Sequence, residues 1–308
     1  MRIAVCGGSG FIGRHLTQAL LDEGHDVVAS YYSKKIDETF PGEGKVYLGV
    51  DLRKLDQVDI LVKGCDVVYQ CAGETAGVAV VSADRLALVP STIVINTNVF
   101  DACRRAGVKT VVAMSSSTGY PNVPHPVREH EYCGPLFPLY REIGTVKRFV
   151  EDLGRMYEMM NVIFLRATNV YGPHDCFDWE RSHVVGALVR KVAERHDPIE
   201  IWGDGEDRRD IVYVTDVVDA LLKAKNFNGH QSFNVGYGVS ITVNEMLNYL
   251  LAASELKTNI VHKPGPRAIP IRQVDTDLAE TLMHWIPEIS PYTGLAKTLK
   301  WYCFDARK

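Results

Sequence analysis

Three evenly spaced glycines near the amino terminus constrain the fold more than any other feature of the sequence. Gly7, Gly10 and Gly13 have the spacing G-x-x-G-x-x-G, and they follow the apolar run "RIAVC" and precede "FIGRHLTQALLDEG", where apolar residues recur at helical spacing. A strand, a glycine turn and a helix in this order bring free backbone N–H groups and the positive end of the helix dipole to one point. The arrangement is typical of a site for a dinucleotide pyrophosphate, and the alternative is a tight turn with a purely structural role. The residues expected to hold the cofactor here are Gly7, Ser9, Gly10, Phe11, Ile12 and Gly13.

The rest of the first half alternates β-rich runs with helical patterns. Strands are predicted at 26–32, 45–50, 66–72, 110–116 and 161–166, with helices at about 84–106 and 138–160. This alternation indicates an α/β fold in which a parallel sheet is covered on both faces, that is, a doubly wound sheet.

The rhythm of the sequence changes after Arg166. Longer loops separate helices predicted near 182–196, 215–225 and 291–304. We therefore expect a dinucleotide-binding domain over residues 1–166 and a smaller substrate lobe over 167–308, with some segments of the second half returning to the first domain.

Composition excludes several classes of function. The 308 residues are 46% hydrophobic and 23% charged, with a formal net charge of −4 and no basic run, so we expect no nucleic-acid partner. No stretch approaches the ~18 apolar residues of a spanning helix, and the predicted location is cytoplasmic with no membrane partner. Seven scattered cysteines without a C-x-x-C pair indicate reduced thiols, and we expect no metal site.

The end of the second predicted strand bears on which dinucleotide is bound. An NAD site usually has Asp or Glu there to hold the ribose 2′-hydroxyl, but this chain has "ASYYSKK". Ser30, Lys34 and Lys35 are suited to a 2′-phosphate, whereas a plain solvated loop is the alternative for the two lysines. The sequence thus favours NADP(H) over NAD(H).

Several further segments carry a resemblance to a known family. These are "VDL" at 50–52, "YQCAG" at 69–73, "SSST" at 115–118, Tyr140, "LRATNVYGP" at 165–173 and "DRRDIVYVTDVVDALL" at 207–222. Together with the glycine turn, they resemble the extended short-chain dehydrogenases/reductases of the nucleotide-sugar epimerase/dehydratase type. The resemblance implies a Rossmann-type fold, and it implies that the adenosine and nicotinamide halves of the cofactor also contact Asp51, Leu52, Cys71, Ala72, Gly73 and Tyr140.

Within this family, "NVYGPHDCF", "SHVVGALVRK" and "IWGDGEDRRD" most resemble the GDP-L-fucose synthases, which epimerise C3 and C5 of a 4-keto sugar and reduce C4 with NADPH. The resemblance implies that Ser116 orients the sugar oxygen, that Tyr140 exchanges the proton and that His183 acts as an acid in epimerisation. Thr118 stands where fucose synthases have the cysteine that removes a proton. The resemblance further implies that a nucleoside diphosphate sugar is held by Asn169, His183, Lys191 and Arg209.

One position departs from the family pattern in a way that affects the chemistry. The catalytic Tyr is normally followed at +4 by Lys, but here Gly144 occupies that position. A phenol titrates near 10, so without a neighbouring cation Tyr140 should stay protonated at neutral pH. Lys147 returns to nearly the same helix face but starts one turn further along the axis. A neutral Tyr can donate a proton during ketone reduction but is a poor base for oxidation.

The sequence therefore favours an NADP(H)-dependent enzyme that transfers hydride at C4 of a GDP-type keto-sugar, with epimerisation at C3 and C5 as a second activity. One alternative is a 4-epimerase or 4-dehydrogenase that keeps its NAD(H). Another is a non-catalytic nucleotide-binding protein that lost the lysine. By resemblance alone, the Tyr-bearing helix and the preceding one are expected to form a homodimer interface.

Overall fold

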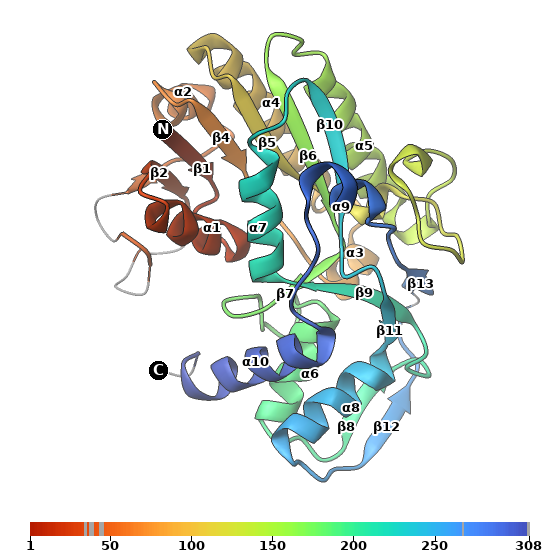
Figure 1. Cartoon of the computed structure of the whole chain (residues 1–308). Helices are drawn as coiled ribbons and strands as arrows, with labels where there is room; N and C mark the ends of the chain where they lie inside the picture. The colour runs from red at the N-terminus through yellow and green to blue at the C-terminus, as the bar shows by residue number, and fades with distance from the viewer. Residues whose placement is uncertain (34–35, 37–39, 43–45, 267, 307–308) are drawn as a thin grey trace.

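The centre of the protein is a seven-stranded, entirely parallel sheet (Figure 1). The computed structural model describes residues 1–33, 36, 40–42, 46–266 and 268–306. The strands are β1 (Arg2–Cys6), β2 (Asp26–Tyr31), β3 (Tyr47–Gly49), β4 (Val67–Gln70), β5 (Thr110–Ser116), β6 (Asn161–Ala167) and β10 (His230–Val235). Their order is β10-β6-β5-β4-β1-β2-β3, which confirms the doubly wound fold predicted from the sequence. The order reverses at β1, so a crevice opens between the ends of β1 and β4.

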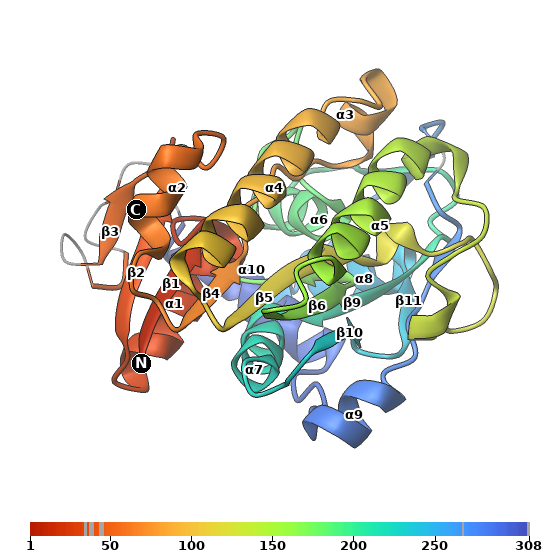
Figure 2. The same ribbon diagram turned by 90° about the horizontal axis from the view of Figure 1, so that it is seen from above.

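Helices cover both faces of this sheet (Figure 2). One face carries α2 (Leu55–Val62), α4 (Val89–Ala106) and α5 (Arg141–Arg155), and the other carries α1 (Phe11–Asp22) and α7 (Val214–Ala224). Successive residues of a strand point to opposite faces of the sheet, since Val111 packs with α4 and Val112 packs with α7. This is why the strands are continuous apolar runs rather than alternating ones.

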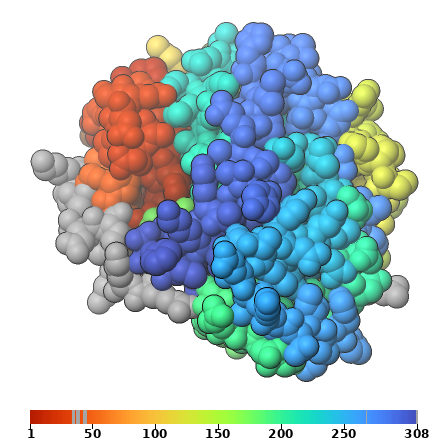
Figure 3. Space-filling model, turned by 60° about the horizontal axis from the view of Figure 1, so that its bottom comes forward, coloured from red at the N-terminus to blue at the C-terminus, as the bar shows by residue number. Residues whose placement is uncertain are grey.

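The smaller lobe begins at the carboxyl end of the sheet, because β6 runs almost directly into β7 (Asn169–Tyr171). Its other strands are β8 (Ile199–Trp202), β9 (Arg208–Tyr213), β11 (Ser240–Thr242), β12 (Ile260–Lys263) and β13 (Ile271–Arg272). Its helices α6 (Val184–Ala193), α8 (Val243–Ser254) and α10 (Pro291–Phe304) share one apolar core, built around Leu188, Leu247 and Leu295. Figure 3 shows α10, in dark blue, on the outer surface beside the light-blue α8.

The second half of the chain contributes segments to both the large sheet and the smaller lobe. After the lobe strand β9, α7 and β10 return to the large sheet, and α9 (Asp277–Met283) packs beside them. Short helical turns lie at α3 (Val78–Ala83), η1 (Ser117–Gly119), η2 (Glu129–Glu131) and η3 (Pro138–Tyr140).

The structure refines the sequence-based boundaries at several points. The long helix predicted from residue 84 starts at Val89, with Pro90 in its first turn, where the missing proline N–H costs nothing. The helix predicted from about residue 138 begins there as the 3-10 turn η3, whose last residue is Tyr140, and it continues as α5 to Arg155 rather than to residue 160. Helix α8 was missed although its start carries a capping box, in which Thr242 and Glu245 bond each other's backbone N–H. No described helix combines the length and apolar character needed to cross a membrane.

Candidate active site

The glycine turn has the geometry of a phosphate cradle. Gly7 has φ +76°, and a Cβ on Gly13 would lie 2.1 Å from the Gly7 carbonyl oxygen, so neither position accepts a larger residue without a shift. Helix α1 starts after Gly10 with no side-chain cap and no acidic residue in its first turn. Its first N–H groups are thus left for an anionic ligand. These residues fit the pyrophosphate of a dinucleotide.

Beneath the turn, Ser30 is buried and its Oγ accepts a hydrogen bond from the Gly7 N–H at 2.8 Å. Ser30 was expected to reach a 2′-phosphate, but its hydroxyl instead supports the glycine turn. Ser9 is joined to the same strand by a backbone bond to the Ser30 carbonyl. Lys34 and Lys35 lie outside the described residues.

A cation that the sequence-based reasoning overlooked lies beside Asp51, which the family resemblance places near the adenosine. Arg53 donates to the Asp51 carboxylate at 2.8 Å and to the Tyr32 hydroxyl at 2.6 Å, just past the end of β2. Leu52, between the two, is buried. The signal was present in the sequence, because Arg53 directly follows the "VDL" that the resemblance places by the adenine.

On the other side of the crevice, Cys71, Ala72 and Gly73 follow β4. A Cβ on Gly7 would lie 2.8 Å from Ala72 Cα, so the two segments touch at the turn. A Cβ on Gly73 would meet no atom within 4 Å, which leaves open space at this edge.

Ser116 is the last residue of β5, and its hydroxyl is already engaged as an acceptor. The Thr118 Oγ1 donates to Ser116 Oγ at 2.9 Å, and the Thr118 backbone N–H approaches it at 3.2 Å. With both lone pairs used, the Ser116 proton is the group left to interact with a ligand. Ser116 is therefore arranged as a hydrogen-bond donor.

A cleft of about 620 Å³ brings together five of the seven residues assigned to proton transfer or substrate binding. They are Tyr140, Asn169, His183, Lys191 and Arg209, which come from α5's start, β7, α6 and β9. Ser116 and Thr118 do not line this cleft. They lie next to α5 instead, where the Thr118 carbonyl faces Gly144. Side chains that sequence reasoning did not single out also line the cleft, namely Val78, Ala79, Trp179, Ser182 and Asp207.

Burial decides the protonation of the two candidate proton carriers. It raises the pKa of Tyr140 above its usual value, although the Arg209 guanidinium opposes part of this and Asp207 adds to it. Burial also lowers the pKa of His183. Both groups are therefore neutral near pH 7, the phenol as a donor and the imidazole as either donor or acceptor.

The two cations of the cleft are held in place by the lobe. Arg209 donates to the Asp207 carboxylate at 3.1 Å, and Lys191 Nζ donates to the Glu200 carbonyl at 2.5 Å. Burial lowers the pKa of Lys191. Fixed cations facing a cavity are suited to a diphosphate, which offers several acceptor oxygens.

Packing explains why the motif lysine is absent. A Cβ on Gly144 would lie 2.7 Å from the Thr118 carbonyl oxygen and 3.1 Å from a Leu136 methyl group, so α5 approaches the Ser116 turn more closely than a side chain allows. Lys147 does not take over, because it does not line the cleft that holds Tyr140. Arg209 is the cation whose charge acts on Tyr140.

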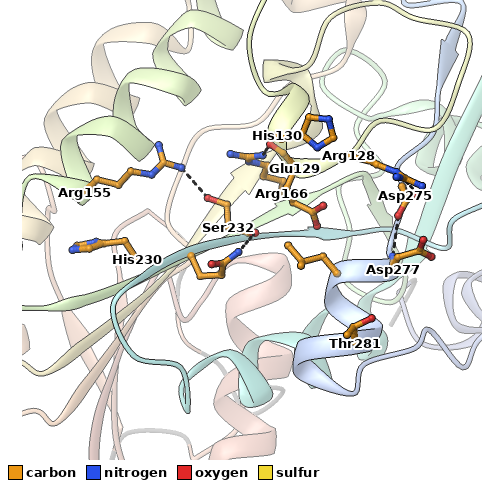
Figure 4. Close-up of a pocket in the computed structure, with 12 residues that line it drawn as sticks. Arg128, Glu129, His130, Arg155, Arg166, His230, Ser232, Asp275, Asp277 and Thr281 are labelled. Carbon is orange, nitrogen blue, oxygen red and sulfur yellow. Dashed lines mark hydrogen bonds and ion pairs between the residues drawn. The ribbon is translucent and has the colours of Figure 1, made fainter.

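Behind Ser116 lies a buried polar group that the sequence did not reveal. Glu151 is fully buried and accepts hydrogen bonds from Ser115 Oγ at 2.6 Å, Arg166 at 2.7 Å and Ser232 Oγ at 2.9 Å. Figure 4 shows the outer end of this group of hydrogen-bonded side chains, where Arg155 donates to Ser232 at the wall of a second cavity of about 600 Å³. None of the predicted site residues lines that cavity.

Comparison with known proteins identifies the family of this chain. The sequence model of the NAD dependent epimerase/dehydratase family matches residues 3–236. GDP-mannose 3,5-epimerase 1 of Oryza sativa subsp. japonica is 27% identical, covering 98% of this chain and 81% of that protein. GDP-L-fucose synthase of Sinorhizobium fredii is also 27% identical, over 96% of this chain and 94% of the relative.

Among solved structures, the UDP-glucose 4-epimerase of Thermus thermophilus in complex with NAD superposes with a TM-score of 0.83 at 25% identity. The match covers 99% of this chain and all of the other. The family resemblance and the fold class predicted from the sequence are thereby confirmed. The chain belongs to the NAD dependent epimerase/dehydratase family, whose members named here act on nucleotide sugars.

Proposed function

We propose that this protein is an NADP(H)-dependent enzyme that reduces C4 of a GDP-linked 4-keto sugar. The observation that carries the proposal is the single cleft in which a neutral Tyr140, a neutral His183 and the fixed cations Lys191 and Arg209 face one another. A phenol beside a diphosphate-binding wall is the arrangement that proton delivery to a nucleotide sugar requires.

The nicotinamide, when bound, supplies the hydride that reaches sugar C4. The family resemblance assigns the hydrogen bond to the carbonyl oxygen to Ser116, which lies at the end of β5 outside the lining of the cleft, and its proton is available because Thr118 occupies its lone pairs. Tyr140 then gives its phenolic proton to the same oxygen, and the phenolate regains a proton from solvent. The product is the C4 alcohol.

Reduction is favoured over oxidation because of the state of Tyr140. Its raised pKa keeps the proton on the phenol at neutral pH, and no lysine lies at position 144 to lower it. Oxidising a hydroxyl requires the phenolate instead, which costs about 1.4 kcal/mol for each pKa unit above the working pH.

Turnover with candidate substrates tests the proposal. NADPH oxidation would be followed at saturating cofactor with GDP-, dTDP- and UDP-linked 4-keto-6-deoxy hexoses. We expect the highest kcat/KM with a GDP sugar. Tight binding of GDP without oxidation of NADPH by any of these sugars would instead support the non-catalytic nucleotide-binding alternative.

A second activity, epimerisation at C3 or C5, is favoured by His183, which lines the same cleft and is neutral. The relatives named GDP-mannose 3,5-epimerase and GDP-L-fucose synthase support it. Thr118 is not suited to remove the carbon-bound proton, because its hydroxyl donates to Ser116 and has no base as a partner among the described residues. We expect slow incorporation of deuterium from D2O into the sugar, and its abolition by His183→Ala identifies His183 as the proton carrier.

The preference for NADP(H) rests on the adenosine end of the site. Tyr31 ends β2 where NAD enzymes usually have a carboxylate, and Arg53 lies next to Tyr32 with a free face toward solvent. The alternative, a 4-epimerase or 4-dehydrogenase that retains NAD(H), predicts that NAD copurifies with the protein. Mass spectrometry of the nucleotides released by heat distinguishes the two.

A further inference from the structure

Arg148 connects the helix that follows Tyr140 to the turn that carries Ser116. Its Nε donates to the Gly119 carbonyl at 2.7 Å, while its Nη1 and Nη2 donate to the carbonyls of Gly134 and Cys133 at 2.8 and 2.7 Å. The three acceptors are backbone carbonyls from two separate segments. An arginine fork that spans several carbonyls fixes direction as well as distance.

Helix α5 packs closely against the Ser116–Gly119 turn because glycines lie at the contact. Arg148 is one helical turn after Gly144, which leaves room for the Thr118 carbonyl. On the far side of the turn, a Cβ on Gly119 would lie 2.2 Å from the Tyr132 ring, whose hydroxyl donates to the Ser116 carbonyl at 2.9 Å. The Ser116–Gly119 turn is thus held between α5 and Tyr132.

We propose that Arg148 is a positioning residue, which sets the separation between the Ser116 hydroxyl and the Tyr140 phenol by fastening α5 to the Ser116 turn. The kinetic part of this inference rests on the proposed function. Gly144 and Arg148 lie one turn apart on the same face of α5, and Tyr140 is the N-cap residue one turn before Gly144, so the fastening at Arg148 also holds the start of the helix next to Tyr140.

The rate of proton transfer depends strongly on the positions of the donor and the acceptor. Both hydroxyls must reach one substrate oxygen, and a misplacement of about 1 Å costs roughly 100-fold in rate. Residues 7–13, which form the cofactor turn, have no contact with Arg148 among its hydrogen bonds. Loss of Arg148 should therefore affect kcat and leave cofactor affinity intact.

The test compares Arg148→Met, Arg148→Lys and the control Arg104→Met, a surface arginine on α4 bonded to Asp101. We expect Arg148→Met to lower kcat about 10- to 100-fold with the Kd for NADPH within about twofold. Arg148→Lys should recover part of kcat, because one ammonium can still bond the Gly119 carbonyl. Hydrogen exchange of the 116–120 amides should be faster in Arg148→Met and unchanged in the control.

The exchange measurement needs no turnover, so it separates this inference from the proposed reaction. If no sugar is reduced but exchange at 116–120 accelerates in Arg148→Met, the proposed reaction fails and the fastening stands. Unchanged exchange, or faster exchange with wild-type kcat, overturns the positioning role. So does a parallel loss of NADPH binding and thermal stability with no difference between the Met and Lys variants.

Discussion

The Tyr140 phenol shows how one side chain's surroundings decide the direction of a reaction. The side chain is half-buried with Arg209 as the nearby cation, and this burial raises the pKa of Tyr140 more than the cation lowers it. The donor form is therefore the stable one, whereas the base form is disfavoured.

The pH dependence of reduction follows from that shift. Because the proton-donating form exists below the raised pKa, kcat for reduction at saturating sugar should stay level through neutral pH and fall only above about pH 10. Tyr140→Phe should lower kcat by about 10²- to 10⁴-fold at constant NADPH affinity. Rates measured between pH 6 and 10.5 check both, and a decline centred near pH 7 would contradict the assignment.

Gly144 provides a prediction about stability. Alanine normally stabilises a helix interior by about 1 kcal/mol over glycine, but a Cβ here would lie 2.7 Å from the Thr118 carbonyl oxygen. Gly144→Ala should therefore lower the free energy of unfolding by about 1–3 kcal/mol, and lysine at this position should not restore a base. The exposed neighbour Thr145→Ala, with an effect within about 0.5 kcal/mol, is the control in denaturant titrations. A stabilised Gly144→Ala would disprove the close contact.

Arg53 provides a prediction about the cofactor. Replacing it with Met should raise the KM for NADPH about tenfold and change that for NADH less than twofold, since only the former has a 2′-phosphate to pair with. Arg105→Met on α4, where the arginine pairs with Asp59 and Asp101, should alter neither. Equal effects on both cofactors would remove Arg53 from the phosphate site.

Five of the residues named from motif positions line one cleft, while their roles stay predictions. Contacts that depend on packing between distant segments were not predicted from the sequence. The acceptor role of Ser30, the Glu151 group and the reason for Gly144 depend on segments far apart in the chain, and no local pattern encodes such contacts. Arg53 could have been named from the sequence, but Lys34 and Lys35 were chosen as the cations for the 2′-phosphate instead.

At the scale of elements, the strand–turn–helix unit at the amino terminus was the most predictable part of the fold. The spacing of its glycines follows from the order strand, turn, helix, because Gly13 must pass close to Gly7 for α1 to start at the end of β1. Helices α3 and α9 are short, with six and seven residues, and give too little periodicity to be recognised. The 12-residue α8 was readable from its capping box.

Two glycines of this crevice should respond differently to alanine. Gly13→Ala would place a Cβ 2.1 Å from the Gly7 carbonyl oxygen, so we expect loss of cofactor binding together with a lower Tm. Gly73→Ala meets no protein atom within 4 Å and should keep its Tm while raising the KM for the cofactor. Calorimetry and fluorescence titration with NADPH measure both quantities. A destabilised Gly73→Ala would show that the open space is occupied.

At the scale of the whole molecule, the predicted homodimer has a candidate surface. Helices α4 and α5 lie side by side on one face of the sheet (Figure 2). They carry Val94 and Phe149, which are 41% and 45% exposed. Singly exposed apolar side chains are ordinary on a protein surface, so this face is a candidate because the family resemblance points to it. The cytoplasmic location inferred from the sequence stays a prediction.

Light scattering tests the dimer. We expect about twice the 34.3 kDa chain mass for the wild type and the single-chain mass for Phe149→Glu, since a buried carboxylate opposes association. Phe304→Glu, at the far end of α10 and 65% exposed, should leave the mass unchanged. A monomeric wild type would remove the α4–α5 surface from consideration.

The late position of β10 in the chain has a consequence for biosynthesis. This strand closes the sheet against β6, and its Ser232 completes the hydrogen bonds around Glu151, yet the lobe strands up to β9 are translated first. Until residue 235 has left the ribosome, the nascent protein carries an open sheet edge and an incompletely bonded buried carboxylate. A polypeptide terminated at residue 166 would keep both defects permanently, which makes it a substrate for chaperones and a nucleus for aggregation rather than a free-standing cofactor module.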